Sequence, residues 1–262
     1  MEALFRERLD TVLIRRGIST HRRVRRLLQR KSVTVNGARI FDCAYPISLS
    51  ADTLAIESTA VPLAPDIYLM MNKGPGTICS RRQDTLYKTV YECIPRQYFA
   101  CAESSSLGNL HTAGRLDTDT EGLLLFTTNG SVSHALTSPQ FHVKKTYRIQ
   151  LENSVSAQEQ AAYSAKCKAG FFIPAEKNEK PFVSLPSRLE WISPAECLLT
   201  ITEGKFHQVK RMIASLGGAV SHLQRIAIGS LSLDCALREN ECRPLSDAEL
   251  LLLFAEKGWQ PS

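Results

Sequence analysis

Apolar residues recur every three or four positions in the first part of the chain, a spacing typical of amphipathic helices. Two segments show it, "RLDTVLIRRG" and "THRRVRRLLQRK". The apolar stripes are Leu9, Val12 and Leu13 in the first segment, and Val24, Leu27 and Leu28 in the second. Gly17 suits the position after the first helix, and Ser19 is a candidate cap for the second. We therefore predict two short helices near the N-terminus.

A β-hairpin is predicted next. The stretch "SVTVNGARI" contains two short β-prone runs around Asn36-Gly37, a dipeptide that favours a type I′ turn. Small residues and two prolines fill "STAVPLAPD", residues 58–66, which predicts a linker. We expect an N-terminal domain of residues 1–57, the linker 58–66, and a larger domain of residues 67–262.

After the linker, alternation of apolar and polar residues predominates. Strands are predicted at "IYLMMNKG", "GLLLFTTNG", "KKTYRIQLE", "SRLEWIS" and "CLLTITEG", the last two as a hairpin around Pro-Ala-Glu. "FHQVKRMIASLGG" has helical spacing and ends in glycines, and a capping box from Ser246 to Glu249 begins a last helix. Strands come in neighbouring pairs with helices inserted irregularly. The pattern therefore predicts an α+β fold with a mostly antiparallel mixed sheet flanked by helices.

Positive charge is concentrated at the N-terminus. The net charge is +6, but residues 1–40 hold 11 Lys and Arg against 3 Asp and Glu, and the remainder holds 21 against 23. Five arginines surround the apolar stripe of the second predicted helix: Arg22, Arg23, Arg25, Arg26 and Arg30. The planar guanidinium is a preferred phosphate ligand, and the narrow stripe without aromatics disfavours a membrane-surface helix. The basic segment predicts binding to nucleic acid.

The remaining composition excludes several classes of protein. No apolar run approaches the roughly 20 residues that span a bilayer, and "MEALFRERLD" lacks the apolar core of a secretory signal. The eight cysteines include no Cys-x-x-Cys pair and lie in apolar contexts, which suits a reducing compartment better than a zinc or redox site. We expect a cytoplasmic protein without a membrane partner.

The stretch "AGRLDTDTEGLLLFTTNG", residues 113–130, has charged residues at alternating positions before an apolar run. These are Arg115, Asp117, Asp119 and Glu121, and in an extended segment all four would share one face. A calcium loop starting at Asp117 fails at its twelfth position, where Thr128 cannot supply a carboxylate. An Asp-x-Asp phosphotransfer site normally follows its buried strand, whereas here the strand follows the aspartates. A salt-bridged turn between Arg115 and Asp117 does not explain the small residues around the cluster.

Four motifs in order make the pattern specific. "GRLDTDTEGLLLFTTNG" resembles the signature of the RsuA-type pseudouridine synthases, in which Gly-Arg-Leu-Asp leads into Thr-x-Gly-Leu. "MNKGPG" at 71–76, "KKTYRIQL" at 144–151 and "EGKFHQVKRM" at 203–212 resemble the other motifs of that family. The N-terminal helices and hairpin resemble the alpha-L RNA-binding domain over roughly residues 6–57. The similarity covers nearly the whole chain, but the common Asn-Lys-Pro is interrupted here by Gly74.

The resemblance implies the pseudouridine synthase fold and the isomerisation of uridine to pseudouridine in structured RNA, without a metal or cofactor. By motif position, Asp117 is the catalytic carboxylate, Tyr147 stacks on the flipped uracil, and Lys210 is a cation at hydrogen-bond distance from Asp117. The carboxylate either adds to C1′ or abstracts a ribose proton, and the sequence leaves both routes open.

The resemblance also indicates residues that hold the RNA. Arg115 matches the arginine that keeps the target nucleotide out of the base stack. The other predicted substrate- or RNA-binding residues are Arg22, Arg23, Arg26, Lys73, His207 and Arg211. Because a helix turns about 100° per residue, only one of Lys210 and Arg211 is expected to face inward. We expect Asp119 and Glu121 to support the turn.

The similarity of "SHALTSPQFHVKKTY" to the RsuA branch favours 16S rRNA, free or in a pre-ribosomal subunit, as the partner. The alternatives are a synthase of the same family that acts on 23S rRNA or tRNA, and a non-catalytic RNA-binding assembly factor. The set of Asp117, Tyr147 and Lys210 argues against the last, because a binding protein has no use for a buried carboxylate that faces a polyanion. We expect a monomer.

Overall fold

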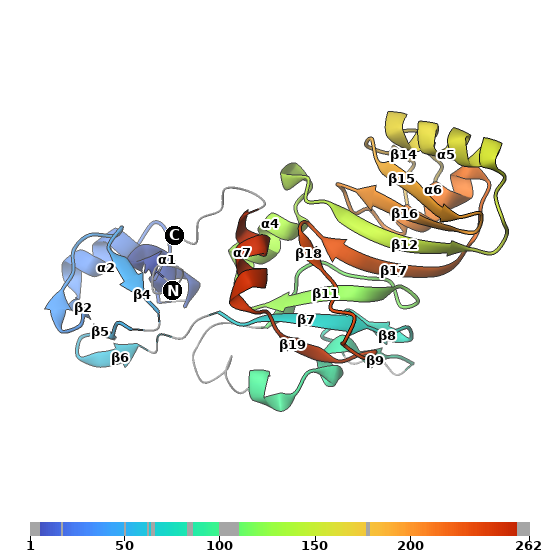
Figure 1. The fold of residues 1–262 in the computed structure, drawn as a ribbon. Coiled ribbons are helices and arrows are strands. Elements are labelled where there is room, and N and C mark those ends of the chain that lie inside the picture. The colour runs from blue at the N-terminus through green and yellow to red at the C-terminus, as the bar shows by residue number, and fades with distance from the viewer. Residues whose placement is uncertain are drawn as a thin grey trace.

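The structure is a computed structural model that describes residues 6–16, 18–49, 51–61, 63, 66–82, 86–99, 110–176 and 179–255. In Figure 1, a small N-terminal unit (blue) lies beside a larger unit built on one sheet. The predicted helix-ending Gly17 lies outside the described residues.

The N-terminal unit has a buried cluster of its own. Its elements are β1 (Arg6–Arg8), α1 (Leu9–Arg15), α2 (Val24–Arg30), β2 (Val33–Val35), β3 (Ala38–Arg39), β4 (Pro46–Ser48), β5 (Leu54–Ile56) and β6 (Thr59–Val61). Strand β1 pairs with β4, and the other four form a sheet in the order β3-β2-β5-β6. The predicted apolar stripes of both helices supply Leu9, Val12 and Leu28 to the cluster, which also takes Ile47 from β4.

The predicted hairpin is confirmed, with Val35 of β2 opposite Ala38 of β3. Asn36 and Gly37 both have positive φ angles, 51° and 79°, as a type I′ turn requires. The N-terminal sheet continues beyond residue 57, the predicted end of the domain, because β6 pairs with β5. Residues 59–61, which lie inside the predicted linker, are therefore a strand of the N-terminal sheet.

The prediction that Ser19 caps the second helix is wrong. Helix α2 begins at Val24, after a turn in which the carbonyl oxygen of Thr20 accepts hydrogen bonds from the backbone N–H groups of Arg23 (2.8 Å) and Val24 (2.9 Å). No side chain caps this helix. The backbone of the turn thus supplies an acceptor for N–H groups at the start of the helix, which a side-chain cap would otherwise bind. The sequence pattern does not reveal these backbone hydrogen bonds.

The larger unit is built on a sheet in the order β15-β16-β12-β17-β11-β7-β19. Its strands are β7 (Tyr68–Lys73), β11 (Glu121–Thr127), β12 (Lys145–Leu151), β15 (Arg188–Ser193), β16 (Glu196–Ile201), β17 (Val220–Ile228) and β19 (Cys242–Pro244). The short strands are β8 (Thr77–Ile78), β9 (Lys88–Thr89), β10 (His111–Thr112), β13 (Phe172–Ile173), β14 (Phe182–Val183) and β18 (Leu231–Ser232). Along this order only β11 and β17 are parallel. The predicted α+β fold with a mostly antiparallel mixed sheet is confirmed.

Helices cover the sheet on both faces (Figure 1). They are α4 (Gly130–Thr137), α5 (Ala157–Ala169), α6 (Gln208–Leu216) and α7 (Asp247–Ala255), with short 3₁₀ turns η2 (Val90–Cys93) and η3 (Pro139–Phe141). Strand β11 is buried on both sides, because Leu124 packs in the cluster with α5 and α6, and Leu123 in the cluster with α4 and α7. A run of apolar residues without alternation is what such a central strand requires.

Several local predictions for the larger unit are confirmed. On β12, Tyr147, Ile149 and Leu151 are buried and the residues between them are more exposed. Helix α6 ends at Gly217, which has a φ of 98°. At the start of α7, the backbone N–H of Ser246 donates to the Glu249 carboxylate (2.8 Å) and the N–H of Glu249 donates to Ser246 Oγ (3.3 Å), as the capping box predicts.

Candidate active site

A pocket of about 470 Å³ lies beside the central strands. Its walls include segment 113–118, residues of β12 and β17, and segment 204–210 at the start of α6. Five of the predicted site residues line it: Arg115, Asp117, Tyr147, His207 and Lys210. The structure therefore gathers residues that are widely separated in sequence around one cavity.

The acidic stretch before β11 is a turn and not an extended strand. The backbone N–H of Thr120 donates to the carbonyl oxygen of Asp117 over 3.1 Å. The Asp117 side chain is 32% exposed and lines the pocket, whereas that of Asp119 is 73% exposed. Glu121 begins β11 and pairs with His222 of β17 at 2.9 Å. The charged side chains therefore do not share one face, as they would in an extended segment. Each of the three acids has different neighbours.

Lys73 anchors this turn from inside the protein. Its side chain is fully buried at the end of β7, and Nζ donates to the carbonyl oxygens of Gly74 (3.0 Å), Thr118 (3.3 Å) and Thr120 (2.9 Å). Burial lowers the pKa of Lys73 below its usual value. In this conformation no part of the Lys73 side chain reaches the surface, so the structure offers no support for the predicted contact with RNA.

The departure from the family pattern at Gly74 has a structural reason. The backbone N–H of Gly74 donates to Asn240 Oδ1 over 2.9 Å, and a Cβ at this position would overlap the side chain of Glu239. A proline would remove that N–H, and this is the stronger constraint, because the exposed Glu239 side chain can move aside. The loop at residues 238–241 and the glycine therefore fit one another.

Lys210 faces the pocket and lies between two carboxylates. Its Nζ is 2.5 Å from Asp119 Oδ1 and 3.9 Å from Asp117 Oδ2. The predicted hydrogen bond to Asp117 is therefore absent in this structure, because the neighbouring carboxylate of the turn reaches the ammonium first. Burial alone would raise the pKa of Asp119, but the hydrogen bond and charge of Lys210 outweigh it and hold that pKa below its usual value.

Arg211, the next residue of α6, points away from the pocket. Its side chain is 6% exposed, and its guanidinium donates to the carbonyl oxygens of Pro174 (2.7 Å) and Lys180 (3.0 Å). It also lies 4.8 Å from the centre of the Phe182 ring. The prediction that only one of Lys210 and Arg211 faces inward to the site is confirmed. The structure offers no support for the predicted RNA contact of Arg211, because protein atoms cover its charge.

His207 lies at the entrance to α6, next to the acidic turn. Its Nε2 is 3.8 Å from Asp117 Oδ2, and its Nδ1 is 3.5 Å from Glu176 Oε1. The backbone has a φ of 48°, a left-handed conformation that non-glycine residues rarely adopt. The imidazole is thus held between two carboxylates.

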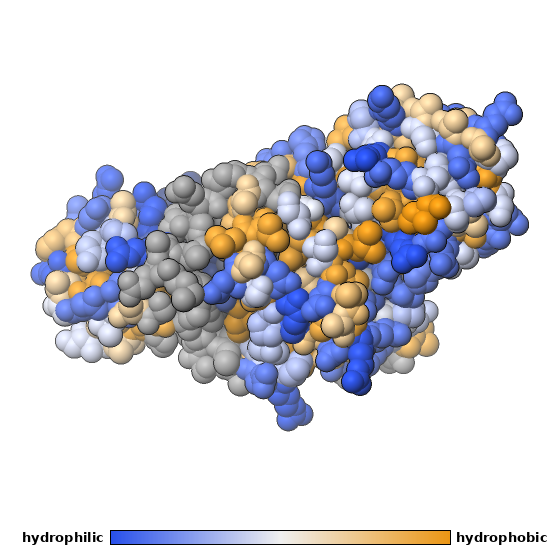
Figure 2. Space-filling model, viewed as in Figure 1, coloured by the Kyte–Doolittle hydropathy of each residue, from blue (hydrophilic) through white to orange (hydrophobic). Residues whose placement is uncertain are grey.

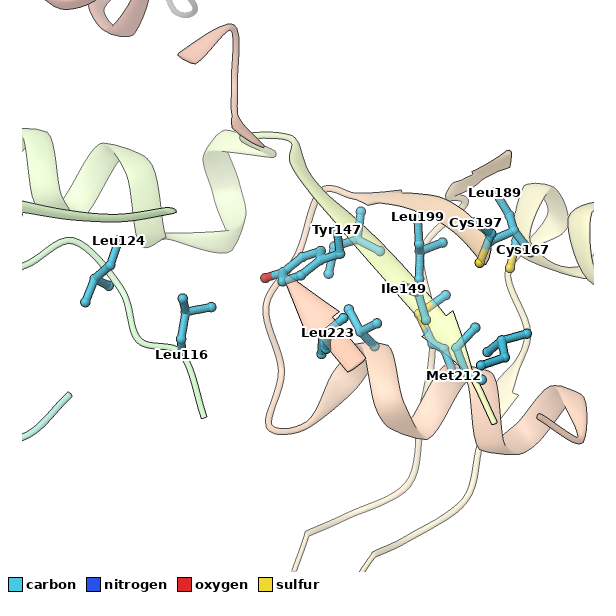
Figure 3. Packing of buried hydrophobic residues seen from close by; sticks show 14 of the residues in the cluster. Leu116, Leu124, Tyr147, Ile149, Cys167, Leu189, Cys197, Leu199, Met212 and Leu223 are labelled. Atoms are coloured by element: carbon cyan, nitrogen blue, oxygen red, sulfur yellow. The ribbon is translucent and has the colours of Figure 1, made fainter. Parts of the chain in front are cut away.

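Tyr147 and Arg225 are neighbours across β12 and β17 and both line the pocket. Figure 3 shows the Tyr147 hydroxyl directed away from Ile149 and Leu199, which pack behind it in the core. The guanidinium of Arg225, which is 2% exposed, donates from Nε to the carbonyl oxygen of Leu123 over 2.8 Å. Sequence reasoning missed Arg225. The sequence did contain an indication, because Arg225 lies two residues after the buried Leu223 and therefore on the same face of the strand.

Arg22, Arg23 and Arg26 lie at or beside the start of α2, and all three are exposed. None of them lines the pocket. In the view of Figure 2, hydrophilic side chains are prominent on the N-terminal unit at the left. These arginines are accessible to a ligand that extends beyond the pocket, whereas Arg115 is exposed at the pocket itself.

Within the described residues, no three His, Cys, Asp or Glu side chains are grouped so that they could bind a metal ion. None of the helices in the described ranges is long and apolar enough to span a membrane.

Comparisons with known proteins identify the family. The family profile of the RNA pseudouridylate synthases matches residues 67–215. The chain is 35% identical to a Haemophilus influenzae protein named ribosomal small subunit pseudouridine synthase A, over 93% of this chain and 97% of that protein. It is 38% identical to the Pasteurella multocida protein of the same name, with the same coverage. A crystal structure of a pseudouridylate synthase with 35% identity superimposes with a TM-score of 0.63 and covers 94% of this chain and 99% of that one. The chain therefore belongs to the RNA pseudouridylate synthases, among the RsuA-type enzymes.

Proposed function

We propose that the protein converts a uridine of 16S rRNA into pseudouridine, with Asp117 as the catalytic carboxylate. The two relatives described above are named as enzymes of the ribosomal small subunit, and the chain spans 97% of each. The observation that carries the proposal is the position of Asp117, a partly buried carboxylate that lines a pocket of about 470 Å³. A volume of this size is within the range of small-molecule sites.

The reaction requires a carboxylate close to the ribose and a surface for the base. The bond between C1′ and N1 breaks, the uracil turns, and a bond forms between C1′ and C5. C5 then loses its proton and N1 gains one, so the product is an isomer of uridine. Asp117 adds to C1′ or removes a ribose proton, and either role requires a fixed position near the sugar. Lys210, with its Nζ 3.9 Å from Asp117 Oδ2, attracts the carboxylate, and the Tyr147 ring supplies a flat wall for the uracil.

The uridine has to leave the RNA stack to enter the pocket, at a cost of a few kcal/mol. Arg115 lies just before the turn at residues 117–120, is exposed and lines the pocket. Its side chain is placed to contact the part of the nucleotide that stays outside the pocket. The exposed Arg22, Arg23 and Arg26 would bind phosphates farther along the RNA. Changing all three to Gln is expected to weaken RNA binding and to reduce its dependence on salt, measured by titration at several salt concentrations.

Asp117→Asn tests the catalytic assignment, with Asp119→Asn as the matched control on the same turn. We expect Asp117→Asn to reduce tritium release from C5-labelled RNA by at least about 10³-fold while RNA binding persists. Asp119→Asn is expected to keep wild-type turnover or to exceed it modestly, because its carboxylate is 73% exposed, lies outside the pocket lining and competes with Asp117 for Lys210. Turnover near wild type in Asp117→Asn would contradict the assignment.

Pseudouridine mapping of total RNA from cells with and without the gene tests the substrate. The proposal requires the loss of a site in 16S rRNA. A lost site in 23S rRNA or tRNA would assign a different RNA to the same chemistry. An unchanged map, together with RNA binding by the purified protein, would favour a non-catalytic binding protein. We further propose that the enzyme acts as a cytoplasmic monomer, which fractionation and light scattering would test.

A further inference from the structure

Phe206 is a large apolar side chain that the fold leaves partly at the surface. It is 43% exposed and does not belong to any of the buried clusters found among the described residues. It lines the active-site pocket, and its ring stacks on His207 with centroids 3.7 Å apart and planes inclined by 20°. A single exposed apolar side chain is normal on a protein surface, but this ring forms part of the pocket wall, where a ligand would meet it.

The loop that carries this ring is held in place by polar contacts. Gln208 Nε2 donates to Glu203 Oε1 over 2.6 Å, and the backbone N–H of Lys205 donates to Gln208 Oε1 over 2.9 Å. On the other side, Glu176 lies 3.5 Å from His207 Nδ1. These contacts fix the chain on both sides of Phe206 and one edge of the His207 ring, so the loop that carries the rings is ordered before any ligand arrives.

We infer that the stacked pair of Phe206 and His207 is a platform for a base that neighbours the target uridine in the RNA. This inference rests on the proposed function and extends it to a second nucleotide. When a uridine leaves the stack, the faces of its neighbours lose their partner, and an aromatic ring replaces that partner regardless of base identity.

The position of the pair matches this role. His207 Nε2 lies 3.8 Å from Asp117 Oδ2, so the platform adjoins the carboxylate that acts on the target nucleotide. His207 covers one side of the Phe206 ring, and the exposed part of the ring remains available to a base. A nucleotide next to the target in the chain is the RNA component that this location fits.

Phe206→Leu removes the aromatic ring and keeps an apolar side chain. Phe172→Leu is the matched control, because Phe172 is 63% exposed and lies outside the pocket lining. Binding is measured with a 16S rRNA transcript, and turnover with the same RNA. We expect Phe206→Leu to bind roughly 5- to 150-fold more weakly, the range for one base–aromatic stack. The loss should fall on KM more than on kcat, Phe206→Tyr should restore it, and Phe172→Leu should bind as wild type does.

A second measurement reports stacking directly. An RNA fragment carries 2-aminopurine on the 5′ or the 3′ side of the mapped uridine, and its fluorescence is compared for wild type and Phe206→Leu. Quenching by the wild type that is lost in the variant supports the platform. Equal binding and equal fluorescence would overturn it, as would a fall in melting temperature that accounts for the loss of binding. A wild-type protein that binds RNA but forms no pseudouridine would instead contradict the proposed function.

Discussion

Replacing Lys73 with Met tests whether this residue positions the turn at residues 117–120, which carries the proposed catalytic Asp117, or contacts RNA. Methionine keeps an apolar, unbranched side chain and removes the ammonium group. The carbonyl oxygens that lose a donor are those of Gly74, Thr118 and Thr120. The first two keep another donor, Thr77 Oγ1 at 2.9 Å for Gly74 and the backbone N–H of Gly76 at 2.8 Å for Thr118. The main loss therefore falls on Thr120.

The effect on stability follows from the one carbonyl oxygen, that of Thr120, that is left without a donor. A buried acceptor that loses its donor costs about 1–3 kcal/mol. Removal of a buried charge offsets part of this, because burial already lowers the pKa of Lys73. We expect a net destabilisation of about 0–2 kcal/mol, which corresponds to a fall in melting temperature of at most about 8 °C. The effect on rate is larger, because a displacement of about 1 Å at a catalytic group costs about 100-fold.

Single-turnover pseudouridine formation, RNA binding and thermal unfolding are measured on the same preparations, with the exposed Lys166→Met on α5 as control. The rate of Lys73→Met at saturating RNA should fall about 100-fold while its affinity for RNA stays within about twofold of wild type. The opposite pattern, weaker binding with a wild-type rate at saturation, is the behaviour of an RNA-contacting lysine. That result would refute the positioning role.

Two further changes test the fold around the site. Gly122→Ala is expected to lower the free energy of unfolding by about 2–4 kcal/mol, because a Cβ would overlap the Arg225 carbonyl and φ is 98°. Urea titration measures it, and wild-type stability would contradict the close approach of β11 and β17. The hydrogen bond from Arg243 lowers the pKa of Glu249 from 4.5 to about 2, so this pair stabilises the fold above pH 4.5 and the contribution is lost as the pH falls toward 2. Glu249→Gln should therefore lose on the order of 1–2 kcal/mol at pH 7, after solvent screening, and little at pH 2, whereas an equal loss at both would contradict the pairing.

Local patterns were sufficient for most of the fold. Alternation identified β12, with Tyr147 and Ile149 buried, and helical spacing identified α6 as far as Gly217. These signals depend on neighbours within one turn or one strand, so the sequence contains all of their causes. The start of α2 was missed because the carbonyl oxygen of Thr20 replaces a side-chain cap.

The roles of charged residues were harder to predict, because their partners are distant in sequence. Nothing in "MNKGPG" shows that the Lys73 ammonium is enclosed, since two of its three acceptors lie 45 and 47 residues away. The rotation of about 100° per residue correctly separated Lys210 from Arg211. It could not show that Pro174 and Lys180 would cover the Arg211 guanidinium, because those carbonyl groups come from another segment.

The three acids of the turn show how partners determine roles that the sequence makes look equal. Asp117 faces the pocket, Asp119 holds the Lys210 ammonium at 2.5 Å, and Glu121 pairs with His222 at 2.9 Å. Because Asp119 is the nearer partner, Lys210 is shared in the free protein and is not committed to Asp117. Asp119→Asn would weaken that competition and leave the ammonium closer to Asp117. A modest gain in activity in this variant would therefore agree with Asp117 as the catalytic acid, whereas a loss as deep as that of Asp117→Asn would mean that the two carboxylates act as a unit.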